Sequence, residues 1–181
     1  MTRLHRETRE TTVTLELSIG ADSTAEIDTP EPFLSHMVGT LVRYGGWRVL
    51  LRATGDLRHH IVEDVAITMG LALKQEIPDT CARFGSALVP MDDALVEAAV
   101  DVGGRAWYQG PVPSRLYDHF LRSLADNAAI TLHVRVLRGR DRHHVVEAAF
   151  KAVGLALRGA IRPGQDVFST KGGVRLRNGS D

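Results

Sequence analysis

Two similar 19-residue segments of this chain indicate its fold: His59-His-Ile-Val-Glu-Asp-Val-Ala-Ile-Thr-Met-Gly-Leu-Ala-Leu-Lys-Gln-Glu-Ile77 and His143-His-Val-Val-Glu-Ala-Ala-Phe-Lys-Ala-Val-Gly-Leu-Ala-Leu-Arg-Gly-Ala-Ile161. Nine of the 19 aligned positions are identical, including both histidines and the glutamate of a His-His-x-x-Glu motif. The second copy begins 84 residues after the first (143 − 59), close to half of the 181-residue chain. Similarity at this spacing indicates that the fold is duplicated.

A weaker repeat lies upstream of each copy and adds one histidine to each half. The segment Phe33-Leu-Ser-His36-Met-Val-Gly-Thr-Leu41 precedes Leu116-Tyr-Asp-His119-Phe-Leu-Arg-Ser-Leu124 by 83 residues (119 − 36). The apolar residues keep the same spacing in both segments. We therefore expect each single histidine to lie on a helix, at about Pro32–Arg43 in the first half and about Leu116–Asn127 in the second.

Each half is expected to continue with a strand, a glycine turn and the helix that carries the double histidine. Pro78 and Pro163 should stop these second helices near Ile77 and Ile161. Alternating and β-branched patterns predict strands at Trp47–Ala53 and Ile130–Val136, with further strands at Thr12–Ile19, Leu95–Val102 and Ala106–Tyr108. The predicted fold class is α+β and internally duplicated, each half being a mostly antiparallel sheet with two helices on one face. We expect the first repeat at residues 1–84, the second at 85–166 in the same compact domain, and a C-terminal tail at 167–181.

The composition is that of an ordinary globular protein, with 44% hydrophobic and 24% charged residues. The 22 basic residues equal the 22 acidic ones, which argues against broad nucleic-acid binding. No apolar stretch is long enough to span a bilayer, and the N-terminus has no secretory h-region. A single cysteine, Cys81, excludes an internal disulfide framework and favours a reducing cytoplasm.

The histidines predict a metal site built from imidazole and carboxylate ligands. Successive helical residues are rotated by about 100°, so His59 and His60 cannot face one ion, whereas Glu63 lies within one turn of both. Each double histidine should then give one ring to each of two ions. The expected ligands are six imidazoles and two carboxylates: His36, His59, His60, Glu63, His119, His143, His144 and Glu147. Three histidines and one glutamate for each ion leave positions for substrate or water, and nitrogen and oxygen ligands suit Mn, Fe, Zn, Ni or Co.

The ordered motifs resemble those of the imidazoleglycerol-phosphate dehydratase family from about Arg6 to Gly173, nearly the whole chain. They are Arg6-x-Thr8-x-Glu10-Thr11, Phe33-Leu-x-His36-Met37, Gly55-Asp-Leu-x-His-His-x-x-Glu-Asp64, Arg83-Phe-Gly85, Pro90-Met-Asp-Asp-Ala-Leu95, Gly104-Arg105, His143-His-x-x-Glu-Ala-x-Phe-Lys151 and Ser169-Thr-Lys-Gly172.

The resemblance implies a fold like that of the second domain of ribosomal protein S5, and two Mn²⁺ ions in each active site, bound by the eight residues named above. It implies a homo-oligomer of 24 subunits with the ions between subunits. It also implies that the phosphate of the substrate is bound by Arg83, Arg105, Ser169 and Lys171. Guanidinium groups suit that role because they bind phosphate oxygens in pairs.

The implied reaction removes water from D-erythro-imidazoleglycerol phosphate and gives imidazole acetol phosphate, a step of histidine biosynthesis. In the family the two ions stabilise an imidazolate form of the substrate ring. The resemblance assigns substrate binding and proton transfer to Glu10, and Asp92 is expected to orient water or a substrate hydroxyl.

Two other functions are compatible with the same residues: a two-metal hydrolase of a phosphorylated metabolite, and a non-catalytic protein whose metals only join subunits. The chain departs from the family at Thr40, Tyr44 and Asp141-Arg142, which changes the surroundings of the expected site but none of its ligands. The short segment before His59 is typical of the compact form of the family. The chain has no phosphatase domain, so a monofunctional enzyme is expected.

Overall fold

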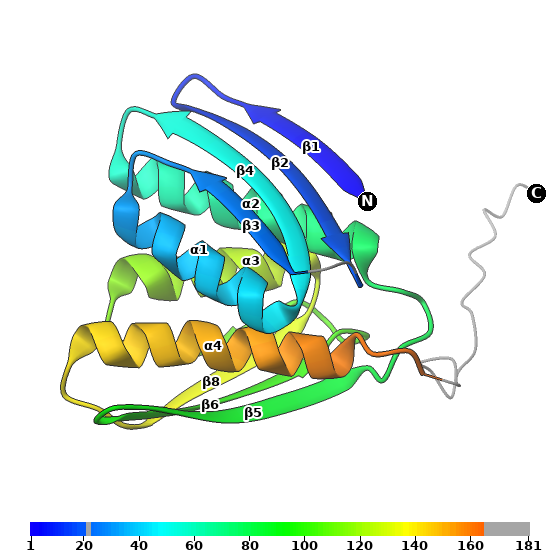
Figure 1. The fold of residues 1–181 in the computed structure, drawn as a ribbon, viewed down its shortest axis with the longest axis vertical. Helices are drawn as coiled ribbons and strands as arrows, with labels where there is room; N and C mark the ends of the chain where they lie inside the picture. Colours follow the sequence, from blue (N-terminus) through cyan, green and yellow to red (C-terminus); the bar gives the residue numbers. More distant parts are fainter. Residues whose placement is uncertain (21–22, 165–181) are drawn as a thin grey trace, which may run out of the picture.

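A computed structural model describes residues 1–20 and 23–164, and these form two four-stranded sheets with four helices between them (Figure 1). The first sheet has the order β1-β2-β4-β3. Its strands are β1 (Thr2–Glu7), β2 (Thr11–Ile19), β3 (Thr24–Asp28) and β4 (Trp47–Gly55). All neighbouring strands are antiparallel except β3 and β4, which are parallel.

The second sheet repeats this topology, with the order β5-β6-β8-β7 and one parallel pair, β7 and β8. Its strands are β5 (Phe84–Met91), β6 (Ala94–Asp101), β7 (Trp107–Gln109) and β8 (Thr131–Arg138). The duplication predicted from the repeated motif is thus confirmed, and so is the α+β class with mostly antiparallel sheets.

The four helices lie as two central layers, α1 (Pro32–Gly45) and α2 (Arg58–Glu76) under the first sheet, α3 (Arg115–Ala128) and α4 (Arg142–Ala160) over the second. Between the halves, α1 packs against α4 and α2 against α3. Because α1 corresponds to α3 and α2 to α4, these two contacts are equivalent. The interface between the halves therefore has the self-complementary form of a two-fold axis.

The glycine shared by the two copies allows the helices to approach closely. A Cβ atom on Gly70 of α2 would lie 2.7 Å from the Leu124 carbonyl oxygen of α3. A Cβ atom on Gly154 of α4 would lie 2.9 Å from the Leu41 carbonyl oxygen of α1. Both distances are too short for a methyl group, so glycine is required where each helix crosses its neighbour.

The order of the elements places all four helix N-termini at one end of the molecule. In the first half β3 leads into α1 and its parallel neighbour β4 leads into α2, and in the second half β7 and β8 lead into α3 and α4 in the same way. Because the two strands of each pair are parallel, the two helices that follow them run in the same direction. Figure 1 shows α1 and α4 also starting at the same end. Contacts between the first turns agree, since Phe33 of α1 meets Tyr117 of α3 with ring centroids 4.9 Å apart. Every histidine of the predicted metal site lies in the first two turns of a helix.

The predicted helices are confirmed, and the second helices end at Glu76 and Ala160, shortly before the prolines. Three strands, β1, β3 and β5, were not predicted. Outward-facing residues of β1 are polar, β3 has only five residues, and β5 contains Gly85 and Pro90, two residue types that are depleted in strands. Pro90 fits because β5 is an edge strand.

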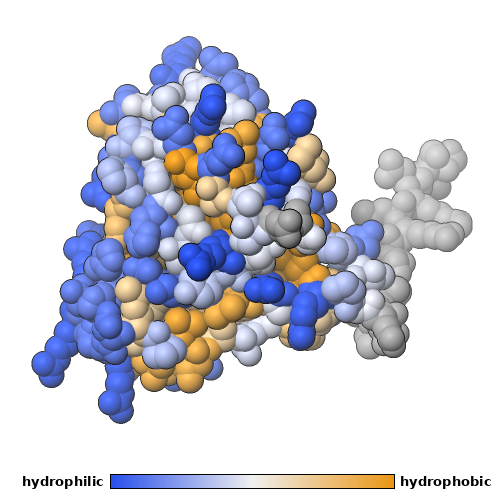
Figure 2. Space-filling view, viewed as in Figure 1, coloured by the Kyte–Doolittle hydropathy of each residue, from blue (hydrophilic) through white to orange (hydrophobic). Residues whose placement is uncertain are grey.

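Apolar side chains from both sheets and all four helices form one continuous core. Apolar atoms also reach the surface along the lower edge of the view, over the second sheet (Figure 2). Among the exposed residues are Phe84 and Leu88, which alternate along β5 with the residues that face α4. Within the described part of the chain, no helix is long and apolar enough to cross a membrane.

Candidate metal centre

The first two turns of α1 and α4 bring together His36, His143 and Glu147. The Glu147 Oε2 atom lies 3.2 Å from His36 Nε2 and 3.1 Å from His143 Nε2. The two imidazole rings are stacked, with centroids 6.0 Å apart. Burial disfavours the charged form of Glu147, but hydrogen bonds from Lys151 and His36 outweigh burial and lower its pKa. A carboxylate thus faces two imidazoles across a gap in which one cation fits.

An equivalent group lies between α2 and α3, formed by His59, Glu63 and His119. The Glu63 carboxylate lies 3.6 Å from His59 Nε2 and 3.3 Å from His119 Nε2. The two rings are again stacked, with centroids 5.2 Å apart. His119 Nε2 is buried and forms no hydrogen bond with the described residues. A buried nitrogen without a hydrogen bond is costly unless another ligand satisfies it, which a metal ion would do.

The spacing of the ligand atoms in both groups fits a transition metal. Within each group the three ligand atoms lie within 4.8 Å of one another. Donors bound at about 2.1 Å in neighbouring positions of an octahedron are roughly 3 Å apart, and the carboxylate-to-imidazole separations of 3.1–3.6 Å lie near that spacing. Each group combines the first helix of one half with the second helix of the other. Neither half alone contains a complete group.

The second ring of each double histidine points away from the group formed by the first. The rings of His59 and His60 are inclined by 73°, and those of His143 and His144 by 81°. His60 Nδ1 lies 2.8 Å from Asp56 Oδ1, and that hydrogen bond raises the pKa of His60. In the same way His144 Nδ1 lies 2.8 Å from Asp93 Oδ1, which raises the pKa of His144.

The two predicted catalytic acids lie in equivalent hairpin turns beside these second rings. Glu10, between β1 and β2, has its Oε2 atom 3.5 Å from His60 Nδ1. Asp92, between β5 and β6, has its Oδ2 atom 3.4 Å from His144 Nε2 and adopts a left-handed backbone with φ 47°. Both side chains are exposed. Each half therefore carries, beside one another, one exposed acidic side chain and one histidine ring that belongs to neither three-residue group.

The two predicted phosphate-binding residues that the structure describes, Arg83 and Arg105, lie at the opposite end of the molecule. Arg83 precedes β5, and its backbone N–H donates to the carbonyl of Ala160, the last residue of α4. Arg105 lies close by, because its carbonyl accepts a hydrogen bond from Thr131 Oγ1 at the start of β8. Arg83 also forms a two-point contact with Asp101, Nε to Oδ1 at 2.8 Å and Nη2 to Oδ2 at 3.0 Å. Ser169 and Lys171 lie outside the described residues.

Within one chain these two ends are too far apart to bind one small substrate. The α-helix rises about 1.5 Å per residue, so α4 alone separates Glu147 from Ala160 by about 20 Å. The structure brings each set of three metal ligands together and brings Arg83 near Arg105, but it does not bring the metal ligands to the arginines.

Three residues of this region were not predicted: Asp56, Asp93 and Lys151. Asp56 and Asp93 orient the second rings, and Asp93 also accepts the backbone N–H groups of Arg140 and Asp141. Lys151 lies 3.0 Å from Glu147 Oε1. Lys151 is four residues beyond Glu147, a helical ion-pair spacing that is visible in the sequence. Asp93 comes from another hairpin, so no local spacing indicates its role.

Comparisons with known proteins give one consistent family. The family model described as imidazoleglycerol-phosphate dehydratase matches residues 29–157. An imidazoleglycerol-phosphate dehydratase of Pyrobaculum calidifontis is 49% identical over 92% of this chain and 96% of its own length. One from Methanoculleus marisnigri is 42% identical over 94% of this chain and 97% of its own length.

Solved structures of that enzyme share the fold. The crystal structure of the Pyrococcus furiosus protein in complex with (S)-C348 superposes with a TM-score of 0.84 at 38% identity, covering 94% of this chain and all of that one. The Staphylococcus aureus protein superposes with a TM-score of 0.74 at 26% identity, over 90% of this chain and 99% of that one. With its duplicated sheets and paired metal-ligand groups, the chain belongs to the imidazoleglycerol-phosphate dehydratase family.

Proposed function

We propose that this protein is an imidazoleglycerol-phosphate dehydratase, a lyase that removes water from D-erythro-imidazoleglycerol 3-phosphate to give imidazole acetol phosphate in histidine biosynthesis. The observation that carries the proposal is the pair of equivalent two-histidine, one-glutamate groups at the N-terminal end of the helices. Relatives that carry this name match nearly the full length of the chain, which supports the same activity here. The enzyme is expected to act in the cytoplasm, as its single cysteine suggests.

Two Mn²⁺ ions for each active site are the proposed cofactors. His36, His143 and Glu147 would hold one ion, and His59, Glu63 and His119 another, with His60 and His144 supplying the remaining imidazoles. When bound, the ions would stabilise negative charge that develops on the imidazole ring of the substrate. Nδ1 of each second ring would donate its proton in the hydrogen bond to Asp56 or Asp93, which leaves Nε2 of each ring free to bind a metal.

The active site is proposed to form between subunits of a homo-oligomer, with 24 subunits expected. In one chain, His60 and His144 belong to neither three-residue group. The chain between the ring and the phosphate of the substrate spans roughly 8 Å at ordinary bond lengths, far less than the length of α4. A single subunit therefore cannot hold both ends of the substrate, whereas the metal-binding end of one copy can meet the arginine end of another.

The other proposed roles fall to acidic side chains near the metal ligands and to phosphate-binding residues at the other end of the molecule. Glu10 would carry the proton removed from the substrate carbon, and Asp92 would orient water or a substrate hydroxyl. Arg83, Arg105, Ser169 and Lys171 would bind the phosphate. Asp101 fixes the plane of the Arg83 guanidinium, so the arginine would meet the phosphate without a further loss of rotamer freedom.

The deciding experiment is a product analysis of the purified, Mn²⁺-loaded protein with imidazoleglycerol phosphate. We expect imidazole acetol phosphate and no inorganic phosphate. Release of inorganic phosphate would instead indicate the two-metal hydrolase, and no turnover by the intact, metal-loaded oligomer would reject the dehydratase.

Glu10→Gln tests the acid–base role in the same assay. The amide keeps the size of the side chain but cannot accept a proton, so kcat should fall by about 10²–10⁴-fold. Metal content and oligomer size should stay unchanged, since Glu10 belongs to neither ligand group. Glu7→Gln, an exposed change on the same hairpin, is the matched control and should retain full activity. An active Glu10→Gln enzyme would exclude Glu10 as the proton-transfer group.

A further inference from the structure

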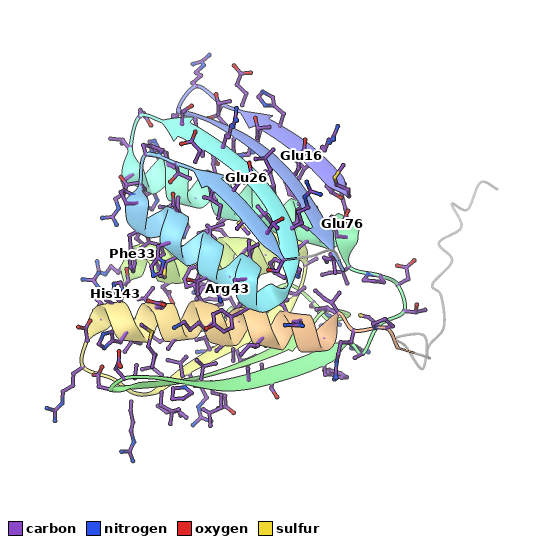
Figure 3. The ribbon with its side chains drawn as sticks, in the orientation of Figure 1. Glu16, Glu26, Phe33, Arg43, Glu76 and His143 are labelled. Atoms are coloured by element: carbon purple, nitrogen blue, oxygen red, sulfur yellow. The ribbon has the colours of Figure 1, made fainter. Side chains whose placement is uncertain are left out.

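The N-terminal ends of all four helices meet around one open pocket of about 310 Å³. Figure 3 shows two of its residues, Phe33 at the start of α1 and His143 at the start of α4, at the same end of the molecule. The other lining residues come from the first turns of the remaining helices and from α4: Arg58, Ser114, Leu116, Tyr117, Arg142 and Val146. The pocket thus lies near the pseudo-two-fold axis that relates the halves.

Two arginines in equivalent positions face this pocket. Arg58 immediately precedes the first double histidine, and Arg142 immediately precedes the second. Arg58 forms an ion pair from Nε to Glu31 at 2.9 Å. Arg142 has one hydrogen bond within the described ranges, from Nη2 to the Ser114 hydroxyl at 3.4 Å. The lining of the pocket therefore contains two guanidinium groups and no carboxylate, and Glu31 pairs with Arg58 from outside the lining.

A buried tyrosine hydroxyl lies in the pocket beside Arg58. Tyr117 is only 2% exposed, and its hydroxyl oxygen forms no hydrogen bond of good geometry with any described residue. Burial raises the pKa of Tyr117, and a hydrogen-bonding contact with Arg58 and the charge of that arginine oppose the change. Because a guanidinium group can only donate, the Tyr117 proton is left for a ligand that accepts a hydrogen bond.

The starts of the four helices contribute little charge of their own. The N-terminus of α2 has neither a side-chain cap nor an acidic residue in its first turn. In α3 the Ser114 side chain caps nothing, and the first-turn acid, Asp118, is already bound by Tyr108 and Val112. In α4 the Asp141 cap binds the His143 backbone N–H. Glu31 is the N-cap residue of α1, and Asp56 accepts the Leu57 N–H just before α2. Each helix start thus has a carboxylate beside it, and the positive charge of the pocket comes from the two arginines.

We propose that this pocket binds a small phosphate-class oxyanion, inorganic phosphate or a phosphomonoester, between Arg58 and Arg142. Each guanidinium group can bind two oxygens, and the hydroxyls of Ser114 and Tyr117 add two donors. A tetrahedral oxyanion offers enough oxygens for donors on several sides, whereas a carboxylate offers only two. The site differs from the proposed substrate-phosphate residues Arg83 and Arg105, which lie beyond the far end of α4. It therefore does not depend on the proposed catalytic function.

The test is a phosphate titration followed by calorimetry, with the full chain in its Mn²⁺-loaded, assembled form. All proteins carry Arg105→Met, so that phosphate binding at the other end of the molecule is weakened and is the same in every protein compared. Adding Arg142→Met should weaken phosphate binding by roughly tenfold or more, because a charged hydrogen-bond donor is lost. Adding Tyr117→Phe should weaken it several-fold while leaving the charge unchanged.

The matched control is Arg115→Met, which removes the same charge from the same end of the molecule but lies outside the pocket. Equal phosphate affinity in the Arg142→Met and Arg115→Met proteins would overturn the proposal. Tighter binding of acetate or malonate than of phosphate would overturn the assigned class.

A crystal of the unmodified protein grown with selenate locates the anion directly by its anomalous signal. A peak between Arg58 and Arg142, within hydrogen-bond distance of the Tyr117 hydroxyl, is the expected result. A pocket filled by a segment of a neighbouring subunit, or no peak while selenate binds elsewhere, would refute the site. Because none of these measurements uses the dehydratase assay, an inactive enzyme with a bound anion would reject the proposed function and keep this inference.

Discussion

At the scale of single residues, the pair formed by Asp101 and Arg83 couples stability to pH. Hydrogen bonds from Arg83 lower the pKa of Asp101 below its ordinary value of 3.8, and both side chains are more than two-thirds buried. Asp101→Asn should lower the free energy of unfolding by about 1–2 kcal/mol at pH 7, because a charged two-point contact becomes a neutral one. Denaturant titrations of both proteins measure this difference.

The contribution of Asp101 to stability should depend on pH in one direction. A carboxylate with a lowered folded-state pKa stabilises the protein above its unfolded pKa and loses that contribution as the pH falls through the lowered value. The difference in the free energy of unfolding between wild type and Asp101→Asn should therefore be at its full size above pH 5 and shrink as the pH falls below 4. Asp28→Asn, an exposed change at the end of β3, is the control and should show no such difference. A stability difference that grew in acid would contradict the lowered pKa of Asp101 as its cause.

Single residues also show what the sequence could indicate about the site. The duplicated motif singled out both double histidines and both glutamates, and the structure brings Glu63 and Glu147 each to two imidazoles. It could not indicate Asp93, because that carboxylate reaches His144 from a hairpin about 50 residues away, a partner that only tertiary structure defines. The assignment of all eight ligands to two ions stays a prediction.

At the scale of elements, the crossing of α2 and α3 depends on Gly70. Gly70→Ala would place a methyl group 2.7 Å from the Leu124 carbonyl oxygen and 2.8 Å from Asn127 Cβ, so the helices must separate. The clash should exceed the gain in helix propensity and lower the free energy of unfolding by about 1–2 kcal/mol. The same separation moves His59 and Glu63 away from His119, so Mn²⁺ affinity should fall as well. Thermal unfolding and metal titration measure the two effects.

A second glycine in an equivalent helix is a suitable control. A Cβ atom on Gly159 of α4 would meet only Gly85 Cα, at an ordinary distance of 3.7 Å. Gly159→Ala should leave stability unchanged or raise it by up to about 1 kcal/mol. If both alanine variants behaved alike, close helix packing at Gly70 would not be the cause.

Elements with strong local patterns were predictable, and those defined by their neighbours were not. The repeated helices and the central strands β2, β4, β6 and β8 follow from apolar periodicity, because the core covers one of their faces. The edge strands β1 and β5 carry polar residues, glycine or proline, and only pairing with β2 and β6 makes them strands. The boundaries expected at residues 84 and 166 stay predictions.

At the scale of the whole molecule, metal ligands at one end and arginines at the other predict complementation between inactive variants. Glu10→Gln alters only the metal-binding end, and Arg105→Met only the opposite end. Each homo-oligomer should be inactive or weakly active. When the two variants are unfolded together and co-assembled, activity should reappear, because some sites then combine two unaltered ends from different subunits.

Mixing the two variants after assembly, without exchange of subunits, is the control and should give no recovery. Chelator treatment of the co-assembled sample should remove the recovered activity. Absence of recovery in a mixed oligomer of confirmed composition would mean that Glu10 and Arg105 act within one subunit, which would contradict the shared site.

The equivalent contacts α1–α4 and α2–α3 have a consequence for the segment that joins the halves. Because each metal-ligand group takes its residues from both halves, two separate half-chains would have to find one another before either group existed. The connection from α2 to β5 turns that encounter into an intramolecular one, at an effective concentration on the order of millimolar. The joining segment thus acts as a tether: it keeps both three-residue ligand groups formed even where the protein itself is scarce.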